Sequence, residues 1–319
     1  MMLRRSLLAL LPAGLTMPGI AGTQGGYPSR PVTIVVGFSA GGTTDATARQ
    51  IADFAQERLG VPVVVENRPG AGATIAAGRV AQARPDGYTL TIVSGSPFTI
   101  APHLQHLPYD PLRDFTFIAR YAASPTPAYV LAESRFASWQ DVLDFARERP
   151  GDLRWTTAAP QGGPRIATQA AFAQLGLETT YVPFGSMADA LTSLLNGTID
   201  MAVSTDYPNL LSAGKVRLLA EMGTDRLPGM EALPTFGELG YPLPLQTAFG
   251  LGGPAGLPAA VVSRWEALLQ DLLATPAWNM LLQRFYSVSA FEGSAAYTAR
   301  LRQEYEATGA QIRRLDLSL

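Results

Sequence analysis

The segment at residues 32–60 constrains the fold more than any other part of this 319-residue chain. Val32–Val36 is an almost continuous run of β-branched residues, which is typical of a strand buried on both faces of a parallel sheet. After Asp45, apolar residues recur at helical spacing, and Gly60 can end the helix. The segment therefore predicts a strand, a loop and a helix, the unit from which α/β folds are built.

The loop between this strand and this helix has the sequence SAGGTT, at residues 39–44. A helix that starts here leaves its first backbone N–H groups free, and its dipole makes this end positive. Loops that follow parallel strands lie at the carboxyl edge of the sheet, where open α/β sheets bind ligands. We therefore expect an anion-binding site here. The loop has neither the Gly-Lys-Ser/Thr of a phosphate loop nor a GxGxxG fingerprint, so no cofactor is expected.

The residues GFSAG, at 37–41, also have the spacing of a hydrolase nucleophile elbow. A serine nucleophile needs a base, usually histidine, that is oriented by a carboxylate. The chain's two histidines, His103 and His106, follow soon after Ser39, whereas the elbow fold places its histidine near the end of the domain. We predict no catalytic residue, and a secreted serine hydrolase that uses Ser39 is the enzyme alternative. No carboxylate or third histidine in pattern accompanies the two histidines, so no metal site is predicted.

Charge and cysteine content exclude further classes of protein. The formal net charge is -2 at pH 7 and no basic run occurs, so a nucleic-acid or anionic-membrane partner lacks its electrostatic signature. The sequence contains no cysteine, which removes disulfides, thiol catalysis and thiolate metal sites.

The first 22 residues resemble a secretory signal peptide. Arg4 and Arg5 precede a short apolar stretch at residues 7–15, and small residues near Gly22 offer a cleavage site. Pro12 and Pro18 interrupt the run of about 20 apolar residues that a membrane anchor needs. We expect an exported, periplasmic protein, with general secretory and twin-arginine export both open.

The alternation of apolar runs and helical segments continues and falls into two sets. The strand candidates after the first are residues 61–65, 89–94, 115–120, 128–132, 153–157, 179–184 and 199–204, and helices are expected near the carboxyl end. Pro-rich and Gly-rich crossings near residues 122–127 and 246–253 suggest two hinges. We predict an α/β fold with two lobes, each a mostly parallel sheet flanked by helices. Residues 27–125 and 250–319 form the first lobe, and residues 126–249 form the second.

Several segments, in this order, resemble the substrate-binding proteins of tripartite tricarboxylate transporters, known as the Bug family. They include VTIVVGFSAGGTTDATARQIADFAQERLGVPVVVENRPGAGATIAAG, YVPFGSMADALTSLLNGTIDMAV and FGLGGPAGLPAAVVSRWEALL. The resemblance covers nearly the whole chain after the signal peptide. It implies a monomeric Venus flytrap that closes on a small carboxylate and delivers it to a membrane permease. A dicarboxylate, a tricarboxylate, an acidic amino acid and an aromatic acid all fit such a cleft. A ligand sensor of the same fold is the other non-enzymatic interpretation.

The resemblance also implies a set of ligand-binding residues. In the family the first glycine-rich loop grips a carboxylate, and a second-lobe loop resembling SAGxGSxxH closes on it. Here Gly163 and Ile166 stand where that second loop has its serine and its histidine. The implied ligand-binding residues are Phe38, Ser39, Ala40, Gly41, Gly42, Thr43, Thr44, Asp45, Ser94, Ser96, Pro97, Ala158, Ala159, Gly162, Gly163, Arg165, Phe184, Gly185 and Asp206.

Several of these residues have a second interpretation that needs no ligand. Gly41 and Gly42 can simply permit a tight turn, and Asp45 can complement the helix dipole. Asp206 is either a turn residue or the partner of a ligand amine. Arg165 is either a solvated arginine or a clamp for a carboxylate.

Overall fold

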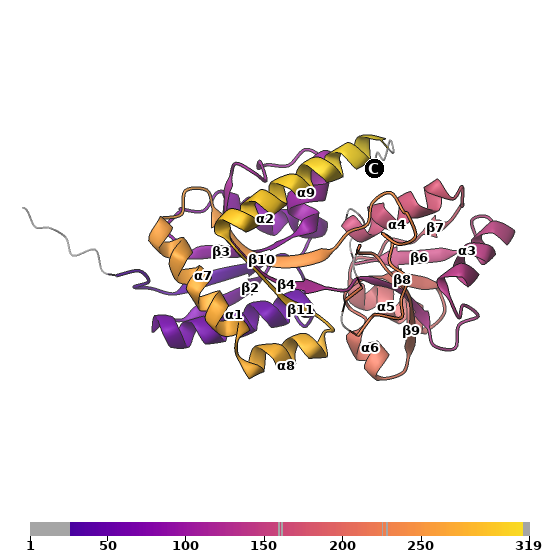
Figure 1. Ribbon diagram of the computed structural model, residues 1–319, viewed down its shortest axis with the longest axis horizontal. Helices are drawn as coiled ribbons and strands as arrows, with labels where there is room; N and C mark the ends of the chain where they lie inside the picture. Colours follow the sequence, from indigo (N-terminus) through magenta and orange to yellow (C-terminus); the bar gives the residue numbers. More distant parts are fainter. Residues whose placement is uncertain (1–25, 159, 161, 225, 228, 315–319) are drawn as a thin grey trace, which may run out of the picture.

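The computed structural model describes residues 26–158, 160, 162–224, 226–227 and 229–314. It shows two α/β lobes side by side along the long axis of the molecule (Figure 1). The expected signal peptide at residues 1–22, and Ala159 of the expected site, lie outside the described residues. No helix within the described ranges is long and apolar enough to cross a membrane.

The first lobe is built on a six-stranded sheet with the order β11-β4-β10-β3-β1-β2. Its strands are β1 (Val32–Val36), β2 (Val63–Asn67), β3 (Thr89–Ser94), β4 (Phe115–Ser124), β10 (Thr247–Pro254) and β11 (Val288–Gly293). Its helices are α1 (Thr43–Leu59), α2 (Thr74–Ala81), α7 (Ala259–Leu273), α8 (Pro276–Arg284) and α9 (Ser294–Arg314).

Both faces of this sheet are covered, as the buried first strand predicted. Val32, Ile34 and Val36 pack into a core with α1, α7 and α8, whereas Val35 packs into a second core with α2 and α9. The two groups of helices lie on opposite sides of the sheet in Figure 1. Alternate residues of β1 thus face opposite cores, which explains why nearly every residue of the strand is apolar.

The second lobe has a five-stranded sheet with the order β7-β6-β8-β5-β9. Its strands are β5 (Pro127–Leu131), β6 (Arg154–Thr157), β7 (Thr180–Tyr181), β8 (Met201–Val203) and β9 (Val216–Glu221). Its helices are α3 (Trp139–Glu148), α4 (Gly163–Gln174), α5 (Met187–Leu195) and α6 (Pro208–Ser212). Helices α3 and α4 share one core with the sheet, and α5 shares another, so this sheet is also covered on both faces.

Both sheets are mixed, so the prediction of mostly parallel sheets is wrong. In the first lobe β1 pairs in parallel with β2 and β3, but β10 and β11 form antiparallel pairs. In the second lobe β5 is antiparallel to both β8 and β9. The physical reason is the connection between the lobes. Strand β4 leads the chain out of the first lobe and β10 leads it back, so the two neighbouring strands run in opposite directions.

Strand β10 occupies the Gly-rich segment near residues 246–253, which the sequence predicts as a crossing between the lobes. It lies inside the first sheet, between β3 and β4. A methyl group built on Gly250 would lie 2.3 Å from Cε1 of Tyr297, so glycine is needed for α9 to pack closely on the strand. Glycine here permits close packing and does not mark a loop.

The two lobes are joined at a pair of adjacent crossings. Strand β4 ends at Ser124 and β5 begins at Pro127, while the return crossing enters β10 at Thr247. The hydroxyl groups of Thr126 and Thr247 lie 2.5 Å apart in a hydrogen bond. The two hinge segments are therefore connected to each other by side chains.

Candidate ligand-binding site between the lobes

The start of α1 is an uncapped helix terminus at the carboxyl end of β1. Gly42 occupies the N-cap position with extended backbone angles, and no side chain caps the helix. Gly41 has a φ of 93°, in the region that favours glycine. Ser39 and Ala40 are exposed. A helix start without a side-chain cap, at the positive end of the helix dipole, suits an anion, and the anion site expected from the sequence stays a prediction.

Asp45 holds this loop in shape from inside the first lobe. Its carboxylate accepts hydrogen bonds from the backbone N–H of Gly41 at 2.9 Å, from Nε of Arg49 at 3.0 Å and from Nδ2 of Asn67 at 2.9 Å. Burial alone would raise the pKa of Asp45, but these three hydrogen bonds together hold it below its usual value. The carboxylate is therefore engaged within the lobe, and the N–H of Gly41 is already taken.

The second lobe faces this terminus with the loop that follows β8. A methyl group built on Gly42 would lie 3.3 Å from Oδ1 of Asp206. Asp206 is fixed by a hydrogen bond from its backbone N–H to Oγ of Ser204, which in turn bonds the hydroxyl of Tyr129 at 2.8 Å. The structure thus brings Gly42 and Asp206, predicted from distant parts of the chain, into one place.

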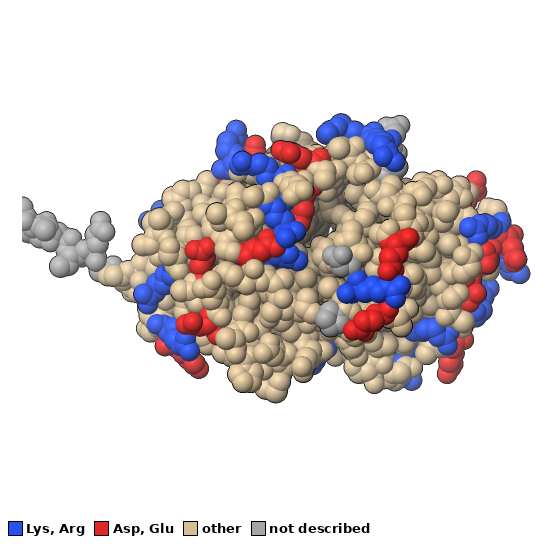
Figure 2. Space-filling view, viewed as in Figure 1, with Lys and Arg blue, Asp and Glu red and all other residues tan. Residues whose placement is uncertain are grey.

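A cavity of about 30 Å³ lies between the two loops. Its lining residues are Gly41, Gly42, Thr43, Thr205, Asp206, Pro208, Asn209 and Phe285. This volume is about that of one water molecule, so a larger ligand needs the lobes to separate. Figure 2 shows that the molecular surface is also hollowed at the boundary between the lobes. Asn209 and Phe285 were not predicted, because their place at the cavity depends on how the lobes meet.

The predicted wall at Ser94, Ser96 and Pro97 lies at the carboxyl end of β3, on the same sheet edge as the α1 loop. The side-chain oxygens of Ser94 and Ser96 are buried and have no hydrogen-bond partner among the described residues. Pro97 is buried, and its carbonyl accepts a hydrogen bond from Tyr109. Two unpaired hydroxyl groups therefore accompany the helix terminus at this edge.

The second-lobe loop before α4 contacts the first lobe through Gly163. A methyl group there would lie 2.4 Å from Cδ1 of Ile100, in the π-helical turn η2 (Ser96–Ile100) that follows β3. Gly162 is the N-cap of α4, which also lacks a side-chain cap, and Ala158 is exposed. Ile166 is buried in the core of the second lobe, so it contributes packing where the family's loop has a histidine.

Arg165 forms no ion pair with any described acidic residue. Its Nη1 donates to the carbonyl of Pro160 at 3.0 Å, and its guanidinium lies 4.7 Å from the centre of the Tyr181 ring. Its Nε is buried without a hydrogen-bond partner. The cation is thus held against the second lobe with part of its hydrogen-bonding capacity unused.

The remaining predicted residues pack within their own lobes or face open space. Phe38 and Phe184 are half-buried against the cores of their own lobes, while Gly185 faces open space. Buried side-chain atoms of Thr168, Tyr207 and Gln246 also have no partner among the described residues. The sequence carries no signal for these three residues, since an unpaired polar atom is visible only after packing.

The serine hydrolase alternative finds no support in the position of the histidines. His103 packs against α9, where its Nε2 lies 2.9 Å from the carbonyl oxygen of Tyr305 and its ring contacts the Tyr305 ring. His106 is exposed, and no described hydrogen bond connects Ser39 to a base. No group of three potential metal ligands occurs among the residues that the structure describes.

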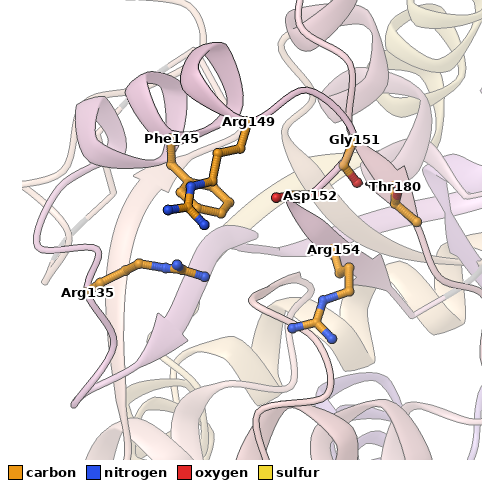
Figure 3. A pocket seen from close by; sticks show the side chains of 7 residues that line it. All are labelled: Arg135, Phe145, Arg149, Gly151, Asp152, Arg154 and Thr180. Carbon is orange, nitrogen blue, oxygen red and sulfur yellow. Dashed lines mark hydrogen bonds between the residues drawn. The ribbon is translucent and has the colours of Figure 1, made fainter.

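A larger cavity, of about 380 Å³, lies at the opposite edge of the second sheet (Figure 3). The guanidinium groups of Arg135 and Arg149 lie beside Phe145, and Arg154 faces them from β6. Arg154 begins β6, whereas Asp206 follows the end of β8, which is parallel to β6. This cavity is therefore separated from the α1 loop by the length of the sheet.

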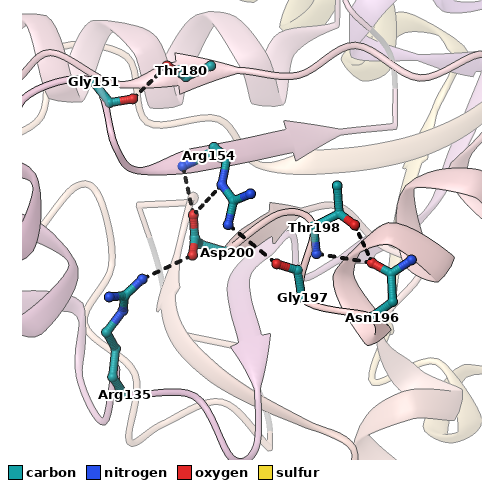
Figure 4. A network of polar contacts seen from close by, with 8 residues as sticks. All are labelled: Arg135, Gly151, Arg154, Thr180, Asn196, Gly197, Thr198 and Asp200. Atoms are coloured by element: carbon teal, nitrogen blue, oxygen red, sulfur yellow. Dashed lines mark hydrogen bonds and ion pairs between the residues drawn. The ribbon is translucent and has the colours of Figure 1, made fainter.

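Asp200 organises that distal region (Figure 4). Its carboxylate accepts the backbone N–H of Arg154 at 2.9 Å and forms ion pairs at 3.3 Å with Arg135 and with Arg154. The network joins the loop after β5 to the amino ends of β6 and β8. We interpret it as a structural network, since two of the three arginines are already paired.

The protein has two sheets, each covered by helices on both faces, and two adjacent crossings join the lobes. The lobes face each other at an uncapped helix terminus. This architecture is that of the bilobed periplasmic solute-binding proteins. The chain belongs to the tripartite tricarboxylate transporter receptor family, whose model matches residues 47–317. The resemblance drawn from the sequence is thereby confirmed.

Individual relatives agree with this assignment. The chain is 34% identical to the UPF0065 protein in the tcbD-tcbE intergenic region of Pseudomonas sp. (strain P51), over 86% of this chain and 82% of that one. It is 32% identical to Protein BugT of Bordetella pertussis, over 72% and 71% of the two chains. Among solved structures, R. palustris Rpa4515 with adipate has a TM-score of 0.84 at 28% identity, covering 92% of this chain and 99% of the other. MatC from Rhodopseudomonas palustris with bound malate has a TM-score of 0.80 at 26% identity, covering 90% and 100%.

Proposed function

We propose that this protein captures a small carboxylate between its lobes and delivers it to the membrane permease of a tripartite tricarboxylate transporter. The observation that carries the proposal is the uncapped terminus of α1, which lines a small cavity together with a loop of the other lobe. A carboxylate bound there gains hydrogen bonds from the backbone and a favourable interaction with the helix dipole.

The relatives support a carboxylate as the ligand. One similar structure holds adipate and another holds malate, and both are linear dicarboxylates. Ser94 and Ser96 supply unpaired hydroxyl groups on the same sheet edge as α1, and Arg165 supplies a cation without an acidic partner among the described residues. Backbone amides, hydroxyl groups and a guanidinium are suitable donors for carboxylate oxygens.

We propose a periplasmic location and a binding role without catalysis. The amino-terminal pattern of residues 1–22 supports export, and mass spectrometry of the secreted protein should find cleavage near Gly22. An intact Met1 on exported protein would contradict this. The match to a family of transporter receptors supports binding over hydrolysis.

A thermal-shift screen of carboxylates, followed by calorimetric titration of each hit, tests the proposal. A ligand at 100 times its dissociation constant should stabilise the protein by about 2.7 kcal/mol. Hydroxylated, saturated, aromatic and amino-substituted acids should all be included, together with uncharged amides of the same acids as controls. If no carboxylate raises the melting temperature above its amide, the carboxylate function is wrong.

A further inference from the structure

Asp206 places a carboxyl group directly across the lobe boundary from the start of α1. Its Oδ1 would lie 3.3 Å from a methyl group on Gly42, and both residues line the same small cavity. The two lobes therefore present complementary groups to each other at short range: the positive end of a helix dipole on one side and a carboxyl group on the other.

No cation offsets Asp206 within the described part of the chain. No arginine, lysine or histidine forms an ion pair with it there, in contrast to Asp45, which pairs with Arg49 at 2.9 Å. Burial raises the pKa of the Asp206 carboxyl, and a hydrogen bond with Ser204 lowers it only in part. A carboxylate in this position gains strongly from any cation that enters the cavity.

A ligand whose only charged groups are carboxylates should bind here with lower affinity. Bound at α1, its negative charge would lie close to that of Asp206. While Asp206 is ionised, like charges about 4 Å apart at an effective dielectric of about 20 lower affinity by roughly a thousandfold. A ligand with an ammonium group beside its carboxylate turns this repulsion into attraction, because each of its charges meets the opposite charge of one lobe.

We propose that the ligand is an α-amino acid or a similar ammonium carboxylate, with its carboxylate on the start of α1 and its ammonium group on Asp206. This inference rests on the proposed function and narrows its ligand class. Gly42 and Asp206 face each other directly, so once the lobes separate enough to admit it, a ligand whose two charged groups are attached to one carbon can contact both. Each lobe then holds one of the two groups, so the ligand binds best when the lobes are closed.

The test compares pairs of acids that differ only in the α-amino group. Calorimetric titrations at pH 7.5 use L-aspartate with succinate, L-glutamate with glutarate, and L-phenylalanine with 3-phenylpropanoate. In every pair that binds, the amino acid should bind at least tenfold more tightly than its deaminated partner. This comparison uses the wild-type protein alone and does not depend on the folding of a variant.

Asp206→Asn keeps the shape of the side chain and removes its charge. It should lower the affinity for the amino acid at least tenfold and leave the deaminated acid unchanged or more tightly bound. Asp152→Asn is the matched control, because Asp152 is an exposed aspartate of the same lobe outside the lobe boundary. The control should preserve the tenfold preference.

The outcomes separate this inference from the proposed function. If succinate or glutarate binds as tightly as its amino acid, or if Asp206→Asn leaves the preference intact, the role of Asp206 is wrong while the carboxylate function stands. If no acid of either series binds the wild-type protein and no other carboxylate does, both are wrong.

Discussion

Both carboxylate oxygens of Glu221 accept a hydrogen bond from the backbone N–H of Thr126, at 3.0 and 2.9 Å. Thr126 lies in the crossing between β4 and β5, and Glu221 ends β9 in the second lobe. The side chain of Thr126 bonds Thr247 of the return crossing. A fully buried carboxylate thus fixes one hinge segment, which is connected to the other by a second hydrogen bond.

The first prediction concerns the pH dependence of this hinge. Burial raises the pKa of Glu221 to about 7, although hydrogen bonds from Thr126 and Gly223 oppose the shift, and Tyr207 lies close enough to feel its charge. Because the folded pKa lies above the unfolded value, the contribution of Glu221 to stability is complete below about pH 4.5 and is lost as pH rises through about 7. At pH 8 the loss is roughly 3 kcal/mol, from 1.36 kcal/mol for each pKa unit.

Urea unfolding between pH 5 and pH 8 measures this effect. In Glu221→Gln, the free energy of unfolding should no longer fall with pH through the ionisation of residue 221. The difference in the free energy of unfolding between variant and wild type should therefore change by a few kcal/mol across the range. Other groups that titrate in the same range are present in both proteins and cancel in the difference. A difference that stays constant with pH would show that Glu221 is ionised in both states.

The second prediction concerns the network around Asp200 at the distal edge of the second lobe. Asp200→Ala removes the acceptor of the Arg154 backbone N–H and leaves two arginines unpaired. It should lower the free energy of unfolding by about 1–3 kcal/mol, the range for hydrogen bonds to charged groups. Ligand affinity should not change, since the network lies at the edge of the second lobe that faces away from the loop after β8 and the α1 loop of the first lobe. A loss of affinity in a folded variant would show that the two regions are coupled.

Local patterns in the sequence predicted much of the fold, because they depend on burial and helix spacing. The strand Val32–Val36 and the end of α1 at Leu59 are found where the pattern places them. The Gly-rich segment of β10 was predicted only as a crossing between the lobes, because its glycines serve the contact between Gly250 and Tyr297 inside the first sheet. Strand direction was also missed, because it depends on the path of the chain between the lobes.

Part of the candidate site could likewise be predicted from local sequence, and part could not. The loop at residues 39–44 could be predicted from its composition, and the uncapped helix start follows directly from those residues. Tertiary packing decides that Asp206 lies opposite Gly42. It also decides that the hydroxyl groups of Ser94 and Ser96 have no hydrogen-bond partner among the described residues. A linear sequence holds no local pattern for such contacts.

The third prediction concerns movement of the lobes. The cavity of about 30 Å³ between the α1 loop and Asp206 is too small for a dicarboxylate or an amino acid. Ligand entry therefore requires an open form, and a ligand that contacts both lobes should favour a closed one. Small-angle scattering should give a smaller radius of gyration at saturating ligand than without ligand. An unchanged radius for a ligand whose binding is confirmed by calorimetry would contradict hinge closure.

The fourth prediction tests the anion-binding terminus by ranking two substitutions. Gly42 has a φ of -81°, which any residue can adopt, so Gly42→Asp should fold. Its carboxylate would face both Asp206 and the carboxylate of the ligand. At an effective dielectric of about 20, like charges about 4 Å apart repel by roughly 4 kcal/mol, which is nearly three decades in affinity. Ser39→Ala removes at most one neutral hydrogen bond and should cost about 0.5–1.5 kcal/mol.

Calorimetric titration of both variants, with melting temperatures measured beside them, gives the ranking. Gly42→Asp should lose detectable binding while Ser39→Ala keeps most of it, at comparable melting temperatures. This order follows from the proposed site, in which backbone N–H groups at the helix terminus bind the anion and the serine hydroxyl is peripheral. If Ser39→Ala abolishes function and Gly42→Asp binds normally, the helix terminus is not the anion site and a nucleophilic role for Ser39 has to be tested directly.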